Sequence, residues 1–262
     1  MKSKIPFIKI TSFLLLVFLC FSCGSKQDVV YYQNIDSMTA QQNSNSYEIK
    51  IQPDDLLMII VSADDPEVAI PFNLRTYSTS TNNRLDIAQG QQTVQLYLVD
   101  QSGNIEFPVL GKLKLGGLTR TEALQLLQTK ISIYIKNPIV NLRIMNFKIS
   151  LQGEVNLPGT YPVASERITL IEALSMAKDL TIYGKRDNIL VIREINGAKT
   201  YNRVDITKSD FINSPFYYLT QNDVVYVEPN KTRINSSVVG PNTSVIISAI
   251  SILVSLSVLI FK

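Results

Sequence analysis

The chain lacks the side chains on which many enzymes depend. Its 262 residues include no histidine and no tryptophan, and only two cysteines. A Ser-His-Asp triad, a Cys-His pair and a histidine-ligated zinc site are therefore excluded for this chain. The sequence also has no Gly-x-x-x-x-Gly-Lys segment, so it offers no phosphate-binding loop for ATP. We expect neither a metal nor another cofactor.

Both cysteines lie at the end of an N-terminal export signal. Three lysines precede an apolar stretch at residues 10–21, which is shorter than the ~20 residues needed to span a bilayer. Ser22 is the small residue that lipid attachment requires directly before Cys23. We predict a lipoprotein signal peptide at residues 1–22 and lipidation of Cys23. An ordinary cleaved signal and lipid attachment at Cys20 are the alternatives.

The basic charge of the chain belongs to this signal. The full sequence has 25 Lys+Arg and 22 Asp+Glu, for a net charge of +3. The signal contains three of the lysines and no acidic residue, so the chain after it has equal numbers of the two charges. That balance gives no electrostatic reason to expect nucleic-acid binding. With both cysteines at the end of the signal, we also expect no internal disulfide.

An uncharged apolar run occupies residues 243–261. As a helix it would be about 28 Å long, close to the ~30 Å thickness of a bilayer's hydrocarbon core, so we predict a membrane-spanning helix. Four serines recur at helical spacing and share one face of this helix: Ser244, Ser248, Ser251 and Ser255. That face is interpreted either as a seam where helices pack closely or as the lining of a water-filled lumen.

The chain between these two ends has mostly β-strand patterning. A polar tract at residues 41–46 favours a flexible, lipidated tether over residues 23–46. Beyond it, apolar and polar residues alternate as they do in half-buried strands. Residues 94–99 and 105–109 predict a β-hairpin, and Asn196-Gly197 predicts the turn of another.

Two short helices carry the same N-terminal signal. Thr119 with Glu122, and Thr169 with Glu172, form the Thr-x-x-Glu pattern of a capping box before an apolar stripe. In this arrangement the threonine hydroxyl and the glutamate carboxylate each accept a hydrogen bond from a free backbone N–H. The repetition predicts two domains, each of which packs one short helix against a sheet.

The boundary between these domains is marked by a change of phase in the alternation of apolar and polar residues. Apolar residues hold even positions over residues 140–144 and odd positions over residues 147–151. Because a one-residue slip exchanges the buried face of a strand, we predict a bulge or a domain boundary at Asn146. The second domain then reaches Pro158-Gly159, which predicts a type II turn with a positive φ at the glycine.

Four motifs follow one another between residues 47 and 228. They are Phe107-Pro108-x-Leu110-Gly111, Gly117-Leu118-Thr119-x-x-Glu122-Ala123, Tyr134-x-x-x-Pro138 and Gly153-Glu154-Val155-x-x-Pro158-Gly159-x-Tyr161. In this order they resemble the polysaccharide export outer-membrane lipoprotein family. Each motif alone is weak, and the combination is specific.

The resemblance implies both a fold and a role. It implies a polysaccharide-export domain, a β-grasp ligand-binding (SLBB) domain, a closed ring of identical subunits, and C-terminal helices that form a barrel through the outer membrane. Capsular polysaccharide or exopolysaccharide would pass through this ring, driven by an inner-membrane copolymerase that regulates chain length. We therefore expect a non-enzymatic outer-membrane translocon, anchored by lipid, with its domains in the periplasm.

The predicted fold class is α+β, with a β-rich export domain, one SLBB-like β-grasp domain and a C-terminal transmembrane α-helix. The predicted segments are a signal peptide at 1–22, a tether at 23–46, the export domain at 47–146, the SLBB domain at 147–230, a linker at 231–242 and the transmembrane helix at 243–261. Better-known members of the family carry two SLBB domains. Asp54 and Asn222 stand where the family often has glycine, and both side chains tolerate unusual turn conformations.

The motif residues are interpreted as structural rather than catalytic. Their glycines and prolines form turns, and Glu122 and Glu172 cap helices. The aspartate pairs at 54–55 and 64–65 are sequence neighbours, which does not suit glycosidase carboxylates placed ~5–10 Å apart across a bond. Two alternatives stay open. One is a non-channel lipoprotein that binds saccharide or braces a secretion machine, and the other is a polysaccharide-modifying enzyme that uses carboxylates alone.

Overall fold

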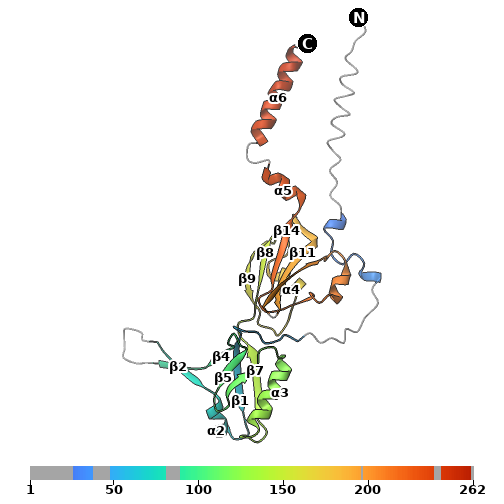
Figure 1. The fold of residues 1–262 in the computed structure, drawn as a ribbon. Coiled ribbons are helices and arrows are strands. Elements are labelled where there is room, and N and C mark those ends of the chain that lie inside the picture. The colour runs from blue at the N-terminus through green and yellow to red at the C-terminus, as the bar shows by residue number, and fades with distance from the viewer. Residues whose placement is uncertain (1–25, 38–47, 81–88, 196, 239–242, 261–262) are drawn as a thin grey trace.

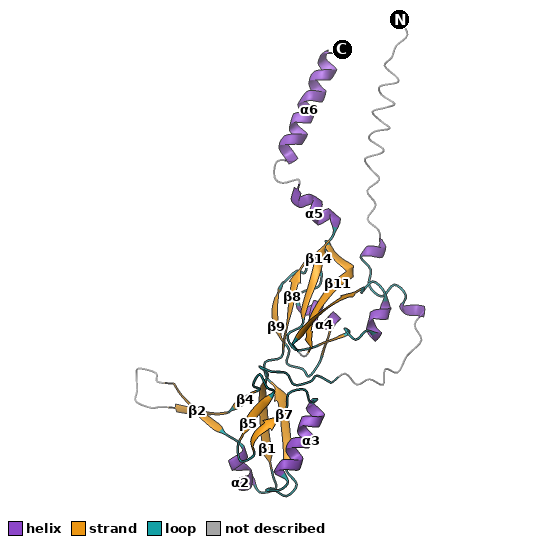
Figure 2. Cartoon of the chain, in the orientation of Figure 1, coloured by secondary structure: helices purple, strands orange, loops and turns teal. Residues whose placement is uncertain are grey.

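The computed structural model describes residues 26–37, 48–80, 89–195, 197–238 and 243–260. Within them the chain forms two domains stacked end to end (Figure 1). Each domain has its own hydrophobic cluster. The helices and strands make an α+β protein that is rich in strands (Figure 2). The predicted signal peptide and Cys23 lie outside the described residues.

A three-stranded antiparallel sheet forms the centre of the first domain. Its strand order is β4 (Leu96–Leu98), β1 (Leu56–Ser62) and β7 (Ile139–Ile144). The helix α3 (Arg120–Ile131) packs against β7 and buries Leu127 and Ile131. Alternate residues of β1 and β7 are buried, because only one face of the sheet meets the helix and the core.

Two hairpins and a short helical segment complete the first domain. They are β2 (Arg75–Ser80) with β3 (Gln89–Val94), β5 (Asn104–Phe107) with β6 (Gly111–Lys114), and α2 (Pro66–Ala69) followed by the 3-10 turn η3 (Ile70–Phe72). The hairpin of β2 and β3 projects from the body of the domain (Figure 2). The predicted hairpin between residues 94–99 and 105–109 is wrong, since β4 pairs with β1 and β5 pairs with β6.

A five-stranded mixed sheet forms the second domain. Its strand order is β12 (Ala198–Val204), β11 (Gly184–Ile195), β14 (Val224–Pro229), β8 (Lys148–Gly153) and β9 (Gly159–Pro162). The neighbours β14 and β8 are parallel, and the other pairs are antiparallel. The helix α4 (Leu170–Met176) packs on this sheet. Beside it lie the short ladder of β10 (Ile168–Thr169) and β13 (Tyr218–Leu219) and the 3-10 turn η4 (Ser209–Asn213).

Both predicted capping boxes are confirmed. The Thr119 hydroxyl accepts from the Glu122 N–H at 3.2 Å, and the Glu122 carboxylate accepts from the Thr119 N–H at 2.7 Å. Thr169 and Glu172 make the same pair of hydrogen bonds at 3.1 and 2.7 Å. These bonds occupy backbone donors that a helix start leaves free, so α3 and α4 begin where the sequence predicts.

The predicted change of phase is also confirmed. Val140 and Leu142 are buried in the first cluster, whereas Phe147 and Ile149 are buried in the second. Asn146 lies between β7 and β8, where the chain passes from one sheet to the other.

The turns follow the sequence with one exception. Asp54 and Asn222 have φ values of 68° and 64°, so each takes the left-handed conformation that glycine adopts most readily. Strands β11 and β12 form a hairpin that turns through Gly197 at φ 78°. The type II turn predicted at Pro158-Gly159 is wrong. Gly159 begins β9 and pairs with Leu151, and this pairing requires an extended backbone.

The segment before the first domain packs on the second. It contains the 3-10 turns η1 (Lys26–Asp28) and η2 (Ile35–Ser37). The ring of Tyr32 stacks on Phe211, with the centroids 5.6 Å apart. The side-chain oxygen of Asn34 accepts hydrogen bonds from the N–H and the hydroxyl of Ser209 at 2.6 and 2.7 Å. Residues 26–37 are thus fixed to the second domain.

Two helices follow the second domain and extend away from the first (Figure 1). They are α5 (Lys231–Val238) and α6 (Thr243–Ile260). In the part of the chain that the structure describes, neither these nor any other helix combines the length and apolarity needed to cross a membrane. The predicted transmembrane helix at 243–261 is therefore wrong. Helix α6 has 18 residues, about 27 Å at 1.5 Å per residue, and serines interrupt its apolar sequence.

Candidate functional site

A cleft of about 600 Å³ lies where the two domains meet. Both domains contribute to its wall: Glu48, Ile49, Arg120, Thr121, Arg143 and Ile144 come from the first, and Phe147, Ala164, Ser165, Glu166 and Arg167 from the second. A volume of this size is typical of sites for small molecules. The cleft is the candidate functional site.

Three local structures place the charged side chains in this cleft. Arg120 is the first residue of α3, directly after the capping threonine. Arg143 lies near the end of β7 on the face opposite the buried Leu142. Glu166 and Arg167 come from the exposed connection between β9 and β10.

An ion pair crosses the cleft. Arg120 Nε lies 3.2 Å from Glu166 Oε1, and the two side chains come from different domains. The same Nε donates a hydrogen bond to the Leu142 carbonyl at 2.9 Å, which fixes the guanidinium against β7. Both side chains are partly exposed, so the pair contributes little to stability on its own.

Positive charge exceeds negative charge in the rest of the cleft. Among the described residues, no carboxylate pairs with the guanidinium of Arg143 or of Arg167. Arg167 instead lies over the ring of Tyr218, 5.4 Å from its centroid. The Glu48 carboxylate accepts a hydrogen bond from the Thr121 hydroxyl at 3.1 Å. Three guanidinium groups thus share the cleft with two carboxylates.

The side chains of Asn146 and Gln221 clamp the crossing between the domains. Asn146 Nδ2 donates to the Asp54 carbonyl at 2.8 Å, and its Oδ1 accepts from the Leu56 N–H at 2.9 Å. From the second domain, Gln221 Nε2 donates to the Asn146 carbonyl at 2.9 Å, while its Oε1 accepts from the Lys148 N–H at 2.8 Å. Both domains therefore hold the segment that forms one side of the cleft.

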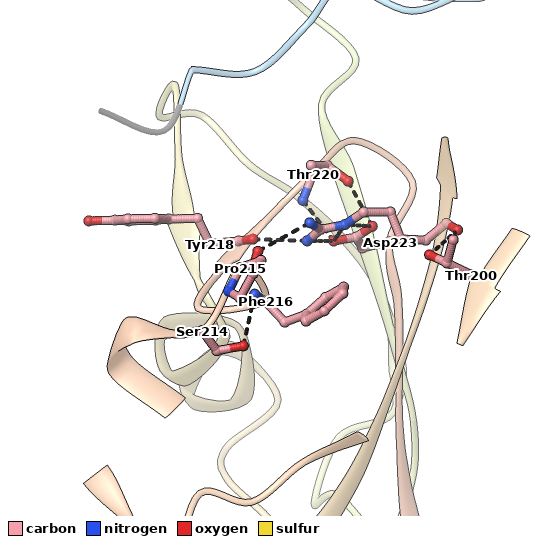
Figure 3. Close-up of polar contacts among 8 residues, drawn as sticks. Thr200, Ser214, Pro215, Phe216, Tyr218, Thr220 and Asp223 are labelled. Atoms are coloured by element: carbon pink, nitrogen blue, oxygen red, sulfur yellow. Dashed lines mark hydrogen bonds and ion pairs between the residues drawn. The ribbon is translucent and has the colours of Figure 1, made fainter. Parts of the chain in front are cut away.

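A buried ion pair supports the loop behind the cleft. Arg193 Nη2 lies 2.7 Å from Asp223 Oδ2, and the two side chains are 7% and 0% exposed. Arg193 also donates to the carbonyls of Pro215 and Tyr218, at 3.3 and 2.9 Å. Figure 3 shows Pro215, Tyr218 and Thr220 gathered around Asp223. The pair therefore fixes the backbone of Tyr218, whose ring lies under Arg167.

The first domain contains the same turn without the arginine. Asp55 Oδ2 accepts from the Gln52 N–H at 2.8 Å, as Asp223 Oδ2 accepts from the Thr220 N–H at 2.7 Å. Asp55 is only 1% exposed, and its Oδ1 has no hydrogen-bond partner among the described residues. Burial is the main cause that raises the pKa of Asp55 to about 6, because it disfavours the charged carboxylate.

Part of the chain is similar to proteins of polysaccharide export. Residues 43–145 match the family described as polysaccharide biosynthesis/export protein. This stretch is similar to the domain of the polysaccharide export family. The resemblance that the four motifs predicted is thereby confirmed.

Two relatives share sequence with most of the chain. One is the EPS I polysaccharide export outer membrane protein EpsA of Ralstonia solanacearum, 29% identical over 220 residues, which are 80% of this chain and 56% of the relative. The protein of the same name in Ralstonia nicotianae is 29% identical over 202 residues, 74% of this chain and 51% of the relative. The chain spans about half the length of both. The names of the family and of the relatives point to transport rather than catalysis.

The predicted family residues are dispersed over the fold and line no common site. Gly153 has φ 87°, and a Cβ at this position would lie 2.1 Å from the Val227 carbonyl oxygen, so only glycine fits there. The Glu154 carboxylate accepts from the Thr181 hydroxyl at 2.7 Å and from Arg233 Nε at 3.0 Å. The remaining family residues occupy loops, the capping box or strands β6 and β9: Pro108, Gly111, Gly117, Thr119, Glu122, Pro138, Pro158, Gly159 and Tyr161.

The other predicted residues also lie outside the cleft. The Asp65 carboxylate caps α2 by accepting from the Glu67 N–H at 3.0 Å. On α6, the hydroxyls of Ser251 and Ser255 donate to backbone carbonyls four residues earlier, at 2.8 and 2.9 Å. Over the ranges that the structure describes, no group of three or more His, Cys, Asp or Glu side chains could hold a metal ion.

The sequence did not identify the arginines of the cleft. Arg120 is part of the capping-box sequence, but the capping box gives no sign of where that side chain points. Arg143 and Arg167 lie 24 residues apart in the sequence, on opposite sides of the domain crossing, and only the packing of the two domains brings them together. The alternation along β7 is the one available signal, since it places Arg143 on the exposed face.

Proposed function

We propose that this protein is an outer-membrane component that exports capsular polysaccharide or exopolysaccharide. The observation that carries the proposal is the export domain at residues 43–145, supported by relatives named for the export of EPS I polysaccharide. The cleft between the domains, with its excess of guanidinium groups, is the surface that we assign to contacts with the polymer.

The proposal includes an orientation of the two domains relative to the outer membrane. A lipid on Cys23 would anchor the chain in the outer membrane, with both domains in the periplasm. Residues 26–37, a short distance after Cys23 in the sequence, pack on the second domain. A lipid so close to this segment would hold the second domain next to the membrane and leave the first domain farther away.

The second domain is proposed to be the SLBB-type β-grasp domain of the resemblance. Its mixed sheet has a parallel pair, β14 and β8, inside the sheet, and one helix packs on it. This arrangement supports the assignment. An inner-membrane copolymerase is proposed as the partner that delivers the polymer, on the basis of the resemblance alone.

The protein is further proposed to assemble as a ring of identical subunits. Helix α6 exposes many large apolar side chains, including Ile247, Ile250 and Leu253 at 55–66% exposure. Such a surface favours burial against another copy of the helix. The hydroxyls of Ser251 and Ser255 donate to carbonyls of their own helix, so they need no hydrogen-bond partner outside it. Serine side chains are also small, which lets two helices pack closely.

The export assignment is tested by deleting the gene and measuring polysaccharide at the cell surface. We expect surface polysaccharide to fall to background, polymer to accumulate inside the envelope, and the intact gene to restore export. Normal surface polysaccharide in the deletion strain would contradict the export role. Loss of polymer of every chain length, inside and outside the cells, would instead indicate a part in synthesis.

The assembly is tested by the mass of the full-length lipidated protein in mild detergent. We expect a closed oligomer, and replacing Ser251 and Ser255 with leucine should weaken it by separating the helices. Ile252→Leu, which changes another face of α6, is the matched control and should leave the mass unchanged. A monomer in all preparations would contradict the ring.

A further inference from the structure

We propose that the cleft between the domains binds carboxylate-bearing sugar residues, so that the exported polymer is an acidic polysaccharide. This inference rests on the proposed function, because it names the chemical class of the polymer. The excess of positive charge among the side chains of the cleft supports the inference. The chain after the signal, in contrast, has equal numbers of basic and acidic residues.

The charges of the cleft favour an anion. Glu166 neutralises Arg120 across the cleft at 3.2 Å. The guanidinium groups of Arg143 and Arg167 then face one remaining carboxylate, that of Glu48, which already accepts a hydrogen bond from a hydroxyl. An incoming carboxylate would therefore reduce an existing excess of positive charge, whereas a cation would increase it.

Two of the three guanidinium groups are held in place before any ligand arrives. Arg120 is fixed by its hydrogen bond to the Leu142 carbonyl. Arg167 lies against the ring of Tyr218, and the buried Arg193–Asp223 pair fixes the backbone of Tyr218. Guanidinium groups bind carboxylates through two parallel hydrogen bonds, and less conformational entropy is lost when the groups are already ordered.

Apolar residues complete the match to a sugar. Ile49, Ile144 and Phe147 contribute to the wall between the charged groups. A sugar ring presents C–H groups on its faces and hydroxyls at its edge, so it needs both apolar and polar surface. The cleft volume of about 600 Å³ is in the usual range for small-molecule sites, and a di- or trisaccharide is of that size.

Glu166 limits the affinity of this site. A ligand carboxylate that approaches Arg120 must compete with Glu166, which already lies 3.2 Å away on an exposed connection. The site should therefore bind one acidic residue weakly and release it readily. Weak binding suits a conduit, because a tight site would stop the moving polymer.

The inference is tested by titrating the full-length protein in detergent with hexagalacturonate and, separately, with maltohexaose. We expect weak binding of the acidic oligosaccharide, which salt should reduce, and no binding of the neutral one. Arg143→Gln and Arg167→Gln should each weaken binding of hexagalacturonate about tenfold, the loss of one charge-assisted contact. Glu166→Gln should strengthen it, because the competing carboxylate is removed.

Arg203→Gln is the matched control. It removes the same charge from an exposed ion pair with Glu228, outside the cleft, and should leave binding unchanged. Circular dichroism of each variant checks the fold. Equal binding of the two oligosaccharides, no binding of either, or equal effects of Arg143→Gln and Arg203→Gln would overturn the inference.

These outcomes are separable from failure of the proposed function. If deletion of the gene abolishes surface polysaccharide but the protein does not bind hexagalacturonate, the export role stands and the acidic-ligand site is wrong. If deletion leaves surface polysaccharide unchanged, the export role fails whatever the titration shows.

Discussion

Asp55 and Asp223 end the same turn in the two domains, yet only Asp223 meets a buried arginine. Each carboxylate accepts a hydrogen bond from the N–H three residues earlier, that of Gln52 or that of Thr220. Arg193 lies 2.7 Å from Asp223, whereas one oxygen of Asp55 is buried with no hydrogen-bond partner in the described chain. The same turn therefore holds a carboxylate that is paired with an arginine in the second domain and one that has no such partner in the first.

The unpaired Asp55 should make the stability of the protein depend on pH. Its pKa is raised from 3.8 to about 6 in the folded chain, mainly by burial. Between pH 4 and 6 the folded state keeps a proton that the unfolded state has lost, so the free energy of unfolding falls as pH rises through this window. This difference in pKa corresponds to about 3 kcal/mol in the free energy of unfolding.

Asp55→Asn removes this titration and should flatten the decline. Urea unfolding at pH 4, 5, 6 and 7 measures it. Asp54→Asn is the neighbouring comparison: it removes a smaller cause of the raised Asp55 pKa than burial, so most of the wild-type slope should remain. Equal slopes in all three proteins would show that Asp55 is not the group responsible.

The buried pair in the second domain should be sensitive to loss of one partner. Arg193→Met leaves the Asp223 carboxylate buried without its counter-ion, and we expect a cost of about 3–5 kcal/mol in the free energy of unfolding. Arg203→Met breaks a pair in which Arg203 is 53% exposed, so its cost should be below about 1 kcal/mol. If thermal or urea unfolding gave similar values for the two variants, the buried pair would not have the role described.

A methyl group at Gly153 should disrupt the second domain. Its Cβ would lie 2.1 Å from the Val227 carbonyl oxygen, and the residue also has a positive φ. Gly153→Ala is expected to cost about 2–5 kcal/mol, from steric overlap and backbone strain together. Gly197→Ala separates the two causes, because Gly197 has φ 78° with open space around the added atom, and strain alone should cost about 1–2 kcal/mol. Equal losses would mean that the close approach to Val227 is unimportant.

The clamp at the domain crossing should be measurable by amide hydrogen exchange. Asn146→Ala removes the acceptor of the Leu56 N–H and the donor to the Asp54 carbonyl. We expect the Leu56 amide to exchange about tenfold faster, while amides in the centre of β11 keep their protection. Uniformly faster exchange would indicate global destabilisation, and unchanged exchange would show that Asn146 does not hold the crossing.

Local features of the fold could be predicted from the sequence, whereas pairings between distant segments could not. The capping boxes at Thr119 and Thr169 and the phase change at Asn146 depend on neighbouring residues, so their patterns are complete within a few positions. The pairing of β4 with β1 depends on segments about 40 residues apart, and no local pattern distinguishes it from the predicted hairpin.

The site was less predictable than the fold. Arg143 and Arg167 belong to different domains, and their proximity depends on how the domains pack. The uncharged apolar run at residues 243–261 did predict a helix, but α6 is not long and apolar enough to cross a membrane. The buried Arg193–Asp223 pair was also missed, because residues 30 positions apart give no charge pattern in sequence.

The most direct test of the account is photo-crosslinking in cells that are exporting polysaccharide. A photoreactive phenylalanine analogue placed at position 164, in the wall of the cleft, is compared with the same analogue at position 130, exposed on α3 outside it. The account predicts that light attaches polysaccharide to the protein at position 164 and not at position 130. Export without any polysaccharide adduct at position 164, or equal adducts at both positions, would contradict it.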